Sequence, residues 1–291
     1  MSEPVAGFAG LGAMGAPMAA NLARAGTLRC VWNRTRARAE AFARDFDVAV
    51  AESPAALADA CDLVLICVSA DADVKSVVAG LLPHLTPQSL VVDCSTVSRA
   101  TACELAQQVR AAGGDFLDAP VSGGVEGARQ GTLVMMVGGE ATALQRARPL
   151  LAAMAARVEH MGPVGSGQAT KAVNQIMAAG INQAVTEALA FARAQQLDLD
   201  KVIEVIAGGA AGNWFLQRRG PTMIRDSFAP GFKVALHHKD LEICRAMAAE
   251  LGTALPVVEM TLIHYRRLME AGFADEDISA LFREKLKLFR R

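Results

Sequence analysis

The sequence has no surplus of either charge. Its 291 residues include 29 Lys and Arg against 30 Asp and Glu, which gives a formal net charge of −1 at pH 7. A chain without a basic surplus creates no field that attracts nucleic acid or an anionic membrane surface. We therefore expect neither nucleic acid nor a membrane among its partners.

Long apolar runs and aromatic residues are also scarce. The apolar stretch at 63–68 has the length of a strand, and no stretch reaches the roughly 18 uninterrupted apolar residues that a membrane-spanning helix needs. Aromatic residues make up 5% of the chain, although hydrophobic residues make up 52%. This composition is typical of buried parallel strands and packed helices. We expect a folded, soluble α/β protein whose length favours two domains.

The six cysteines show no CxxC spacing and no Cys/His cluster. This pattern supports neither a zinc site nor a redox dithiol, so no metal is expected and the cysteines are interpreted as buried, reduced thiols. Near the start, Glu3 and several glycines stand where a secretory signal would carry a continuous apolar segment. These features predict a cytoplasmic protein.

Two patterns divide the chain near residue 163. Before it, short apolar runs alternate with amphipathic stretches, as in a parallel α/β sheet. After residue 167 a long helix over 168–196 is followed only by further helical patterns. The Gly- and Pro-rich segment 161–167 is interpreted as a hinge-like connection. We expect strands at 5–9, 29–32, 63–68, 90–93, 116–119 and 133–137, and later helices near 200–207, 234–251, 256–271 and 275–287.

A glycine-rich turn directly follows the first expected strand. Gly10, Gly12 and Gly15 have the spacing GxGxxG, and a helix over 16–25 follows. The first glycine permits a tight turn, the second lets backbone N–H groups approach a pyrophosphate, and the third lets helix and strand pack closely. This context predicts a Rossmann dinucleotide-binding domain over 1–163, and the later helical patterns predict an all-helical domain over 164–291, joined to it by the long helix. The expected cofactor contacts are Gly10, Leu11, Gly12, Ala13, Met14 and Gly15.

The second expected strand ends in Asn33, Arg34 and Thr35. A domain specific for NAD usually has Asp or Glu there, to bind the ribose hydroxyls. Without that carboxylate a 2′-phosphate is not repelled, and the Arg34 guanidinium can donate paired hydrogen bonds to it. We therefore expect these three residues to bind the cofactor and NADPH to be preferred over NADH. Arg36 and Arg38 are interpreted as the solvated face of the next helix.

Together with this turn, three segments resemble the β-hydroxyacid dehydrogenase family. They are DAPVSGG at 118–124, GSGQATKAVNQ at 165–175 and PGFKVALHHKD at 230–240. The family includes 3-hydroxyisobutyrate dehydrogenase, tartronate semialdehyde (2-hydroxy-3-oxopropionate) reductase and the glyoxylate/succinic semialdehyde reductases, and the third segment is most similar to the tartronate semialdehyde reductases. The resemblance implies an NAD(P)-dependent oxidoreductase that reduces a small aldehyde bearing a carboxylate, as a homodimer or homotetramer.

Lys171, Asn174 and Gln175 lie on one face of the long helix, among apolar neighbours. Burying polar side chains costs free energy unless they are hydrogen-bonded, so polar residues on an otherwise apolar helix require an explanation. Hydride addition to an aldehyde builds negative charge on its oxygen, and a nearby lysine ammonium can donate the proton. A lysine that snorkels to the surface at a helix start is the alternative. The resemblance implies that Lys171 is the catalytic general acid, with Asn174 and Gln175 beside it, although the family often has two consecutive asparagines there.

The resemblance implies further site residues. Ser122, Gly123 and Gly124 would bind the substrate carboxylate, although the sequence of this loop alone fits a flexible turn equally well. Lys239 would contact substrate or cofactor, and Asp240 would orient a lysine. Thr96, at the carboxyl end of a strand, would touch the cofactor. Phe232 would cover the nicotinamide, or it would be an ordinary core residue.

Other residues keep structural interpretations. His237 and His238 are interpreted as helix-surface residues, and Ser98 as a helix cap. The loop at 208–214 either lines the substrate pocket or is a helix–helix turn with Trp214 in the core.

Two rival functions share this architecture. One is an NADPH-dependent imine reductase, and the other is a catalytically silent dinucleotide-binding scaffold. Relatives of both kinds generally lack the lysine at position 171, so Lys171 disfavours them. The sequence leaves open whether tartronate semialdehyde, succinic semialdehyde, methylmalonate semialdehyde or glyoxylate is the substrate, because one methylene changes binding by only ~1–3 kcal/mol. It also leaves open the direction of the reaction in the cell.

Overall fold

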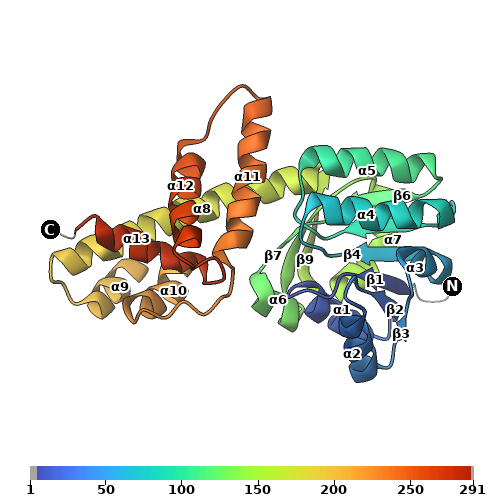
Figure 1. Cartoon of the computed structure of the whole chain (residues 1–291), viewed down its shortest axis with the longest axis horizontal. Coiled ribbons are helices and arrows are strands. Elements are labelled where there is room, and N and C mark those ends of the chain that lie inside the picture. Colours follow the sequence, from blue (N-terminus) through green and yellow to red (C-terminus); the bar gives the residue numbers. More distant parts are fainter. Residues whose placement is uncertain (1–4, 290–291) are drawn as a thin grey trace. The chain divides into compact units, whose positions relative to one another are not determined.

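The computed structural model describes residues 5–289, which form two compact units that part between Lys171 and Ala172. The first is a sheet covered by helices on both faces, and the second is helical (Figure 1). The predicted fold class is confirmed. The units part inside helix α8 (Ser166–Ala194), beyond the expected boundary at 163/164. The reason is that the first turn of α8 bonds to the first unit, where Gln168 Nε2 donates to the Ser95 carbonyl at 2.8 Å.

The sheet of the first unit has the strand order β3-β2-β1-β4-β5-β6-β8-β7, and β9 pairs with β8. Strands β1 to β6 pair in parallel, whereas β8 is antiparallel to β6 and β7. The chain leaves β1 towards β2 and later returns to β4 on the other side of β1, so the turn after β1 lies at a topological switch point, where open α/β sheets bind ligands. The strands are β1 (Ala6–Ala9), β2 (Leu28–Trp32), β3 (Ala49–Val50), β4 (Leu63–Ile66), β5 (Leu90–Asp93), β6 (Asp115–Asp118), β7 (Val121–Ser122), β8 (Leu133–Gly138) and β9 (Ala155–Gly162).

Alternate residues of the central strands enter two separate cores. In β4, Leu63 and Leu65 pack with one set of helices, whereas Val64 and Ile66 pack with the other. A strand buried on both faces needs apolar residues at every position, which is why these strands are recognisable as continuous apolar runs. The first set comprises α1 (Gly15–Arg24), α2 (Arg36–Phe46), α6 (Gly124–Gln130) and α7 (Ala141–Ala152); the second comprises α3 (Pro54–Ala60), α4 (Asp71–Leu81) and α5 (Arg99–Ala111), and η1 (Leu82–His84) is a 3-10 turn after α4.

Strand β9 was not predicted. It pairs only with β8, and polar or exposed residues such as Glu159 and Met161 interrupt its pattern. An edge strand of this kind gives a weak sequence signal. The expected hinge-like segment therefore begins inside a strand, and further along it the Gly165 N–H donates to Asp118 Oδ1 at 2.7 Å.

The second unit is helical, as predicted. Its core includes the fully buried Tyr265, Leu262 and Leu281. Two predictions were wrong in detail. Helix α10 was missed because Gly220 and Pro221 interrupt its pattern. The stretch 275–287 is not one helix, because Asp277 has extended backbone and its side chain accepts the Ser279 N–H at 3.1 Å. The helices after α8 are α9 (Leu199–Ala207), α10 (Trp214–Ile224), α11 (Val234–Glu250), α12 (Pro256–Glu270), the 3-10 turn η2 (Ile278–Ala280) and α13 (Leu281–Lys287).

Within residues 5–289, none of the helices combines the length and the apolar character needed to cross a membrane. The same residues contain no group of three or more His, Cys, Asp or Glu side chains that could hold a metal ion.

Candidate active site

The turn between β1 and α1 can adopt its conformation because Gly10 and Gly15 carry no side chains. A Cβ on Gly15 would lie 2.0 Å from the Gly10 carbonyl oxygen, and one on Gly10, where φ is +98°, would lie 2.3 Å from the Cys67 carbonyl oxygen. Both positions therefore require glycine. Gly12 differs, because within residues 5–289, its chain neighbours aside, no atom lies within 4 Å of the place of its Cβ. Since no side chain caps α1, the turn leaves open space at a helix N-terminus, the arrangement that binds a pyrophosphate.

Asn33 ties this turn to the end of β2. Its Oδ1 accepts the Leu11 N–H at 2.9 Å, and its Nδ2 donates to the Thr35 carbonyl at 2.9 Å. The side chain therefore fixes the backbone of both segments, which is a structural role in addition to the predicted cofactor contact.

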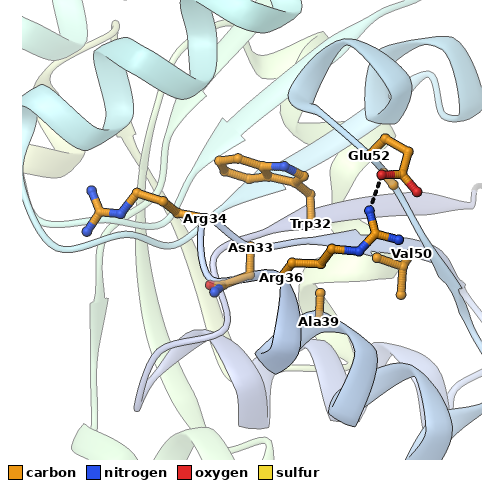
Figure 2. A pocket seen from close by; sticks show the side chains of 8 residues that line it. Trp32, Asn33, Arg34, Arg36, Ala39, Val50 and Glu52 are labelled. Carbon is orange, nitrogen blue, oxygen red and sulfur yellow. Dashed lines mark hydrogen bonds and ion pairs between the residues drawn. The ribbon is translucent and has the colours of Figure 1, made fainter.

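A pocket of about 220 Å³ opens at the end of β2, and its lining includes Arg34 and Arg36, whose side chains point in opposite directions (Figure 2). Arg34 is 82% exposed and pairs with Asp73 at 2.5 Å. Arg36 bonds to Glu52 and to Glu40, and the Arg36 guanidinium holds the pKa of Glu52 below its usual value. The pocket is lined by Trp32, Asn33, Arg34, Arg36, Ala39, Val50, Ala51 and Glu52.

Sequence reasoning missed the position of Arg36, which it assigned only to the solvated face of α2. Arg36 stands in the first turn of that helix, at the level where β2 ends, and there its side chain lines the pocket while staying 58% exposed. The cradle at Gly12 and this pocket together fit the pyrophosphate and the adenosine ribose of a dinucleotide.

The loop that carries Thr96 is tied on both sides. Ser95 Oγ accepts the Val68 N–H at 2.9 Å, which joins the loops after β4 and β5. The Val97 N–H donates to Gln168 Oε1 at 3.2 Å. Ser98 caps α5 by accepting the Thr101 N–H, as predicted. Thr96 therefore stands in an ordered loop at the carboxyl edge of the sheet.

Lys171 is brought to the loop that contains Ser122, Gly123 and Gly124. Its side chain is buried, and Nζ donates to the Val121 carbonyl at 2.8 Å, directly before Ser122 in the chain. Gly123 and Gly124 have φ values of +128° and +62°, which favour glycine at both positions. Helix α6 begins at Gly124, so the buried Lys171 Nζ lies beside a loop that leads into a helix N-terminus.

Two buried carboxyl groups lie side by side under these loops. Asp93 and Asp118 are register partners at the ends of β5 and β6. Burial raises the pKa of Asp93 to about 7, although its bonds with Ser95 oppose the shift. Its Oδ1 accepts the Ser95 N–H at 2.9 Å, whereas Oδ2 has no hydrogen-bond partner within the described part of the chain. Burial also raises the pKa of Asp118, against the N–H groups of Gly165 and Gln168 that favour its charged form.

In the second unit, the other predicted polar residues form one hydrogen-bonded chain. Asn174 Nδ2 donates to Gln175 Oε1 at 2.7 Å, and Gln175 Nε2 donates to Asp240 Oδ2 at 2.6 Å. The second oxygen of Asp240 pairs with Lys239 Nζ at 2.9 Å. Gln175 and Asp240 are buried.

The interpretation as a helix-surface residue was wrong for His237, whereas His238 is only partly buried and lies 3.7 Å from Glu242 on the same helix. His237 is fully buried, its Nδ1 is 3.0 Å from the Tyr265 hydroxyl, and its Nε2 is 3.2 Å from the Gln175 carbonyl oxygen. Burial lowers the pKa of His238 below its usual value. Helix α11 contacts both α8 and α12, which is why His237 is buried. A single histidine in a helical pattern does not indicate which face of the helix is packed.

Two aromatic residues have environments that the sequence left open. The Phe232 ring lies 5.1 Å from the His237 ring, at the border of the second unit's core. Trp214 is 63% exposed at the start of α10 and is therefore not a core residue.

Both halves of the chain match models of dehydrogenase families. Residues 5–162 match the NAD binding domain of 6-phosphogluconate dehydrogenase, and residues 165–284 match the NAD-binding model of NADP-dependent 3-hydroxyisobutyrate dehydrogenase. With the glycine cradle and the fold, these matches define the class: the chain is an NAD(P)-dependent oxidoreductase.

Relatives narrow this class to a family. The 2-hydroxy-3-oxopropionate reductase of Escherichia coli is 39% identical over 254 residues, 86% of each chain. The NAD-dependent L-serine dehydrogenase of Pseudomonas aeruginosa is 35% identical over 94% of this chain and 95% of its own. A solved Mycobacterium tuberculosis 3-hydroxyisobutyrate dehydrogenase with L-serine is 35% identical, has a TM-score of 0.89, and is matched over 97% of this chain and 98% of its own. The chain belongs to the β-hydroxyacid dehydrogenase family.

Proposed function

We propose that this protein is an NADPH-dependent reductase of a small aldehyde or keto acid bearing a carboxylate, with Lys171 as the general acid. The observation that carries the proposal is the 2.8 Å bond from Lys171 Nζ to the Val121 carbonyl, beside Ser122 and the two glycines. An ammonium can protonate a developing alkoxide, and the loop can hold a carboxylate. The names of the relatives from E. coli and M. tuberculosis support an acid substrate of this kind.

The chain's own groups divide the work between binding and proton transfer. A nicotinamide cofactor held at the Gly10–Gly15 turn would supply the hydride for the carbonyl carbon. The Ser122 hydroxyl and the N–H groups of Gly123 and Gly124 hold the carboxylate, and Lys171 donates a proton to the carbonyl oxygen as its negative charge grows. Placed proton transfer of this kind contributes about 10²–10⁴-fold to the rate. In the oxidative direction the neutral Lys171 amine accepts the proton.

The second unit supplies substrate-holding residues in this proposal. Asn174 and Gln175 follow Lys171 on the same helix, and we assign them to the substrate, with Lys239 as a cationic partner for substrate or cofactor. The buried Asp240 accepts from Gln175 and pairs with Lys239, so it orients both side chains. Phe232 is assigned to cover the nicotinamide.

The choice of NADPH rests on the end of β2, where the sequence has Asn33 and Arg34 in place of an acidic residue. Arg34 lines the pocket and is exposed, so it can exchange its partner Asp73 for a 2′-phosphate. Thr35 and Thr96 are proposed as further cofactor contacts. Replacing Arg34 by Ala should weaken NADPH binding by about 10-fold or more, since a hydrogen bond to a charged group contributes about 1.5–3 kcal/mol. NADH binding should not change, and the exposed Arg38→Ala is the matched control.

The activity itself is tested by the decay of nicotinamide absorbance. NADPH and NADH are each offered with tartronate semialdehyde, succinic semialdehyde, methylmalonate semialdehyde and glyoxylate. We expect oxidation of NADPH with at least one acid, and a loss of about 10²–10⁴-fold in Lys171→Ala. Lys75→Ala, which removes an exposed lysine paired with Glu104, is the control and should keep full activity.

Two outcomes would support the rival functions. Faster turnover of cyclic imines than of the four acids would indicate an imine reductase. Tight NADPH binding without turnover of any carbonyl compound or imine would indicate a dinucleotide-binding scaffold.

We further propose a homodimer or homotetramer that associates through the helical unit. Val173 and Met177, one turn apart on α8, are both more than half exposed. Apolar side chains that share an exposed helix face are typical of association surfaces. Light scattering should give a mass of two or four chains, and the mass of a single 30.6 kDa chain would refute the proposal.

A cytoplasmic location is also a proposal. Its support is that Cys30, Cys61, Cys94 and Cys103 carry free thiols, although Cys103 is only partly buried. Unpaired thiols are typical of proteins in reducing compartments. Detection of the protein in an oxidising compartment by cell fractionation would contradict this proposal.

A further inference from the structure

A buried carboxylate holds the start of the helix that carries Lys171. Asp118, the last residue of β6, is 0% exposed. Its Oδ1 accepts the Gly165 N–H at 2.7 Å, and its Oδ2 accepts the Gln168 N–H at 2.8 Å. The first N–H groups of a helix have no partner within the helix, so this carboxylate does the work of a cap. Its charge also interacts favourably with the positive end of α8.

Two glycines leave room for this carboxylate. A Cβ on Gly138 would lie 2.3 Å from Asp118 Oδ1. A Cβ on Gly167 would lie 2.8 Å from Asp118 Oδ2 and 2.3 Å from the Met136 carbonyl oxygen. Backbone atoms therefore surround the Asp118 carboxylate and restrict it to one position.

A second bond joins the same two segments three residues further along each. Val121 lies three residues after Asp118, and Lys171 lies three residues after Gln168. Lys171 Nζ donates to the Val121 carbonyl. The Gln168 side chain adds bonds to the Ser95 carbonyl and the Val97 N–H, on the loop that carries Thr96. The first turn of α8 can neither slide nor rotate without breaking buried bonds to charged groups, so the position of Nζ is fixed relative to both loops.

We propose that Asp118 is a positioning residue for Lys171, which sets the ammonium against the Ser122–Gly124 loop by holding the first turn of α8. This inference rests on the proposed function, because it takes Lys171 as the general acid. Asp118 itself touches the N–H groups of α8. Its contribution to the rate therefore passes through Lys171.

A double-mutant cycle tests this dependence. Asn at position 118 has nearly the volume of Asp but offers one oxygen and one NH₂ group, so one N–H group of α8 loses its acceptor. We compare kcat, KM and NADPH affinity in the wild type, Asp118→Asn, Lys171→Ala and the double variant. Asp118→Asn should lower kcat by about 10–100-fold, the scale on which small misplacements act, and change NADPH affinity by less than about threefold, because the Gly10–Gly15 turn is not involved.

The decisive comparison is the effect of Asp118→Asn when Lys171 is absent. If Asp118 acts through Lys171, the substitution should lower the residual rate of Lys171→Ala by less than about threefold, because coupled residues are not additive. An equal loss in both backgrounds would overturn the inference and leave Asp118 a structural role only. Asp115→Asn, at the exposed start of β6, is the matched control and should keep the wild-type rate.

Two further outcomes are separated by the design. If Lys171→Ala itself keeps full activity, the general-acid assignment is wrong and the positioning role fails with it. If Asp118→Asn does not fold, Asp118→Ser takes its place, because its hydroxyl oxygen can still accept one of the two N–H groups. It should also lower kcat by about 10–100-fold in the presence of Lys171 and have little effect in its absence, and an additive loss would again overturn the inference.

Discussion

The turn after β1 and the surroundings of Lys171 both lie at the carboxyl edge of the sheet, but different interactions determine their structures. The cofactor turn, Gly10–Gly15 after β1, is shaped by missing side chains, and its close contacts are with backbone oxygens. The lysine seat, which we define as Asp118, Val121, Gly165, Gln168 and Lys171, is held by buried charged groups that bond to backbone. The turn therefore should not tolerate added atoms, whereas the seat should not tolerate the loss of a hydrogen-bonding partner.

Gly167→Ala should have the largest combined effect, because it should lower both the unfolding free energy and kcat. An Ala there would place its Cβ 2.3 Å from the Met136 carbonyl oxygen, and that backbone atom cannot move away. We expect a loss of about 1–3 kcal/mol of unfolding free energy from overpacking and a further loss of kcat. Urea unfolding and turnover measure the two effects. Gly180→Ala is the control, since its Cβ would make only an ordinary 3.7 Å contact with Val257; a stable, fully active Gly167→Ala would contradict the picture of a rigid seat.

The second prediction concerns the pH dependence of stability beneath the seat. Folding raises the pKa of Asp93 from 3.8 to about 7, through burial and the nearby charges of Asp118 and Asp71. The stabilisation is therefore complete below about pH 4 and is lost as the pH rises through about 7. Asp93→Asn should remove this decline and raise the unfolding free energy at pH 8 by about 2–4 kcal/mol.

Denaturant unfolding at pH 5 and pH 8 checks the Asp93 prediction. Asp115→Asn, which changes an exposed carboxylate paired with Arg146, should keep the wild-type slope. The same slope in Asp93→Asn would mean that Asp93 is charged throughout this range.

A smaller effect should separate binding from stability at the cofactor turn. Gly12→Ala meets no atom within 4 Å, so the fold should keep its stability, but the new methyl group would fill the cradle. We expect NADPH binding to weaken by about 10–100-fold, the equivalent of about 1–3 kcal/mol of steric overlap.

Gly26→Ala is the opposite case, with open space and a φ of +71°. It should lose about 1 kcal/mol of stability through backbone strain and bind NADPH normally. If calorimetry showed that both variants bind NADPH alike, Gly12 would have no role in the cradle.

The smallest effect is expected at Ser98, a side chain that serves only local structure between the two places. Its Oγ accepts the Thr101 N–H at 3.1 Å and donates to Asp71 Oδ1 at 2.8 Å. Ser98→Ala should lower the unfolding free energy by about 1 kcal/mol, the usual cost of a lost cap. Unchanged kcat and NADPH affinity would mean that Ser98 belongs neither to the cofactor turn nor to the lysine seat. A large loss of kcat would mean that the start of α5 is part of the lysine seat.

The same contrast explains what the sequence could predict. The turn after β1 is defined by glycines within six positions, so its spacing and strand–turn–helix context predicted it. The central strands were recognisable because both of their faces are buried. The motifs at 118–124 and 165–175 were recognised by resemblance, but their mutual contact was not, because the bond between Asp118 and Gln168 joins residues 50 apart.

Residues outside these local signals were misjudged for physical reasons. His237 bonds to the Gln175 carbonyl 62 positions away, and no periodicity on α11 marks that contact. Arg36 has the pattern of a solvated helix, and only the fold brings it to Glu52 and the pocket. Strand β9 lies at an edge of the sheet, where alternating polar residues hide it.

The continuity of α8 limits how this protein can be recombined with its relatives. The compact units part between Lys171 and Ala172, inside a helix of 29 residues, so a chimaera joined there would mix two parents within the helix that carries Lys171, the proposed general acid. A junction near Pro163 would keep α8 from one parent, but it would separate Gly165 and Gln168 from the Asp118 to which they bond. Exchange of substrate preference between family members by domain shuffling should therefore succeed only when the residue at 118 and the two glycines around it are kept with the helix that they hold.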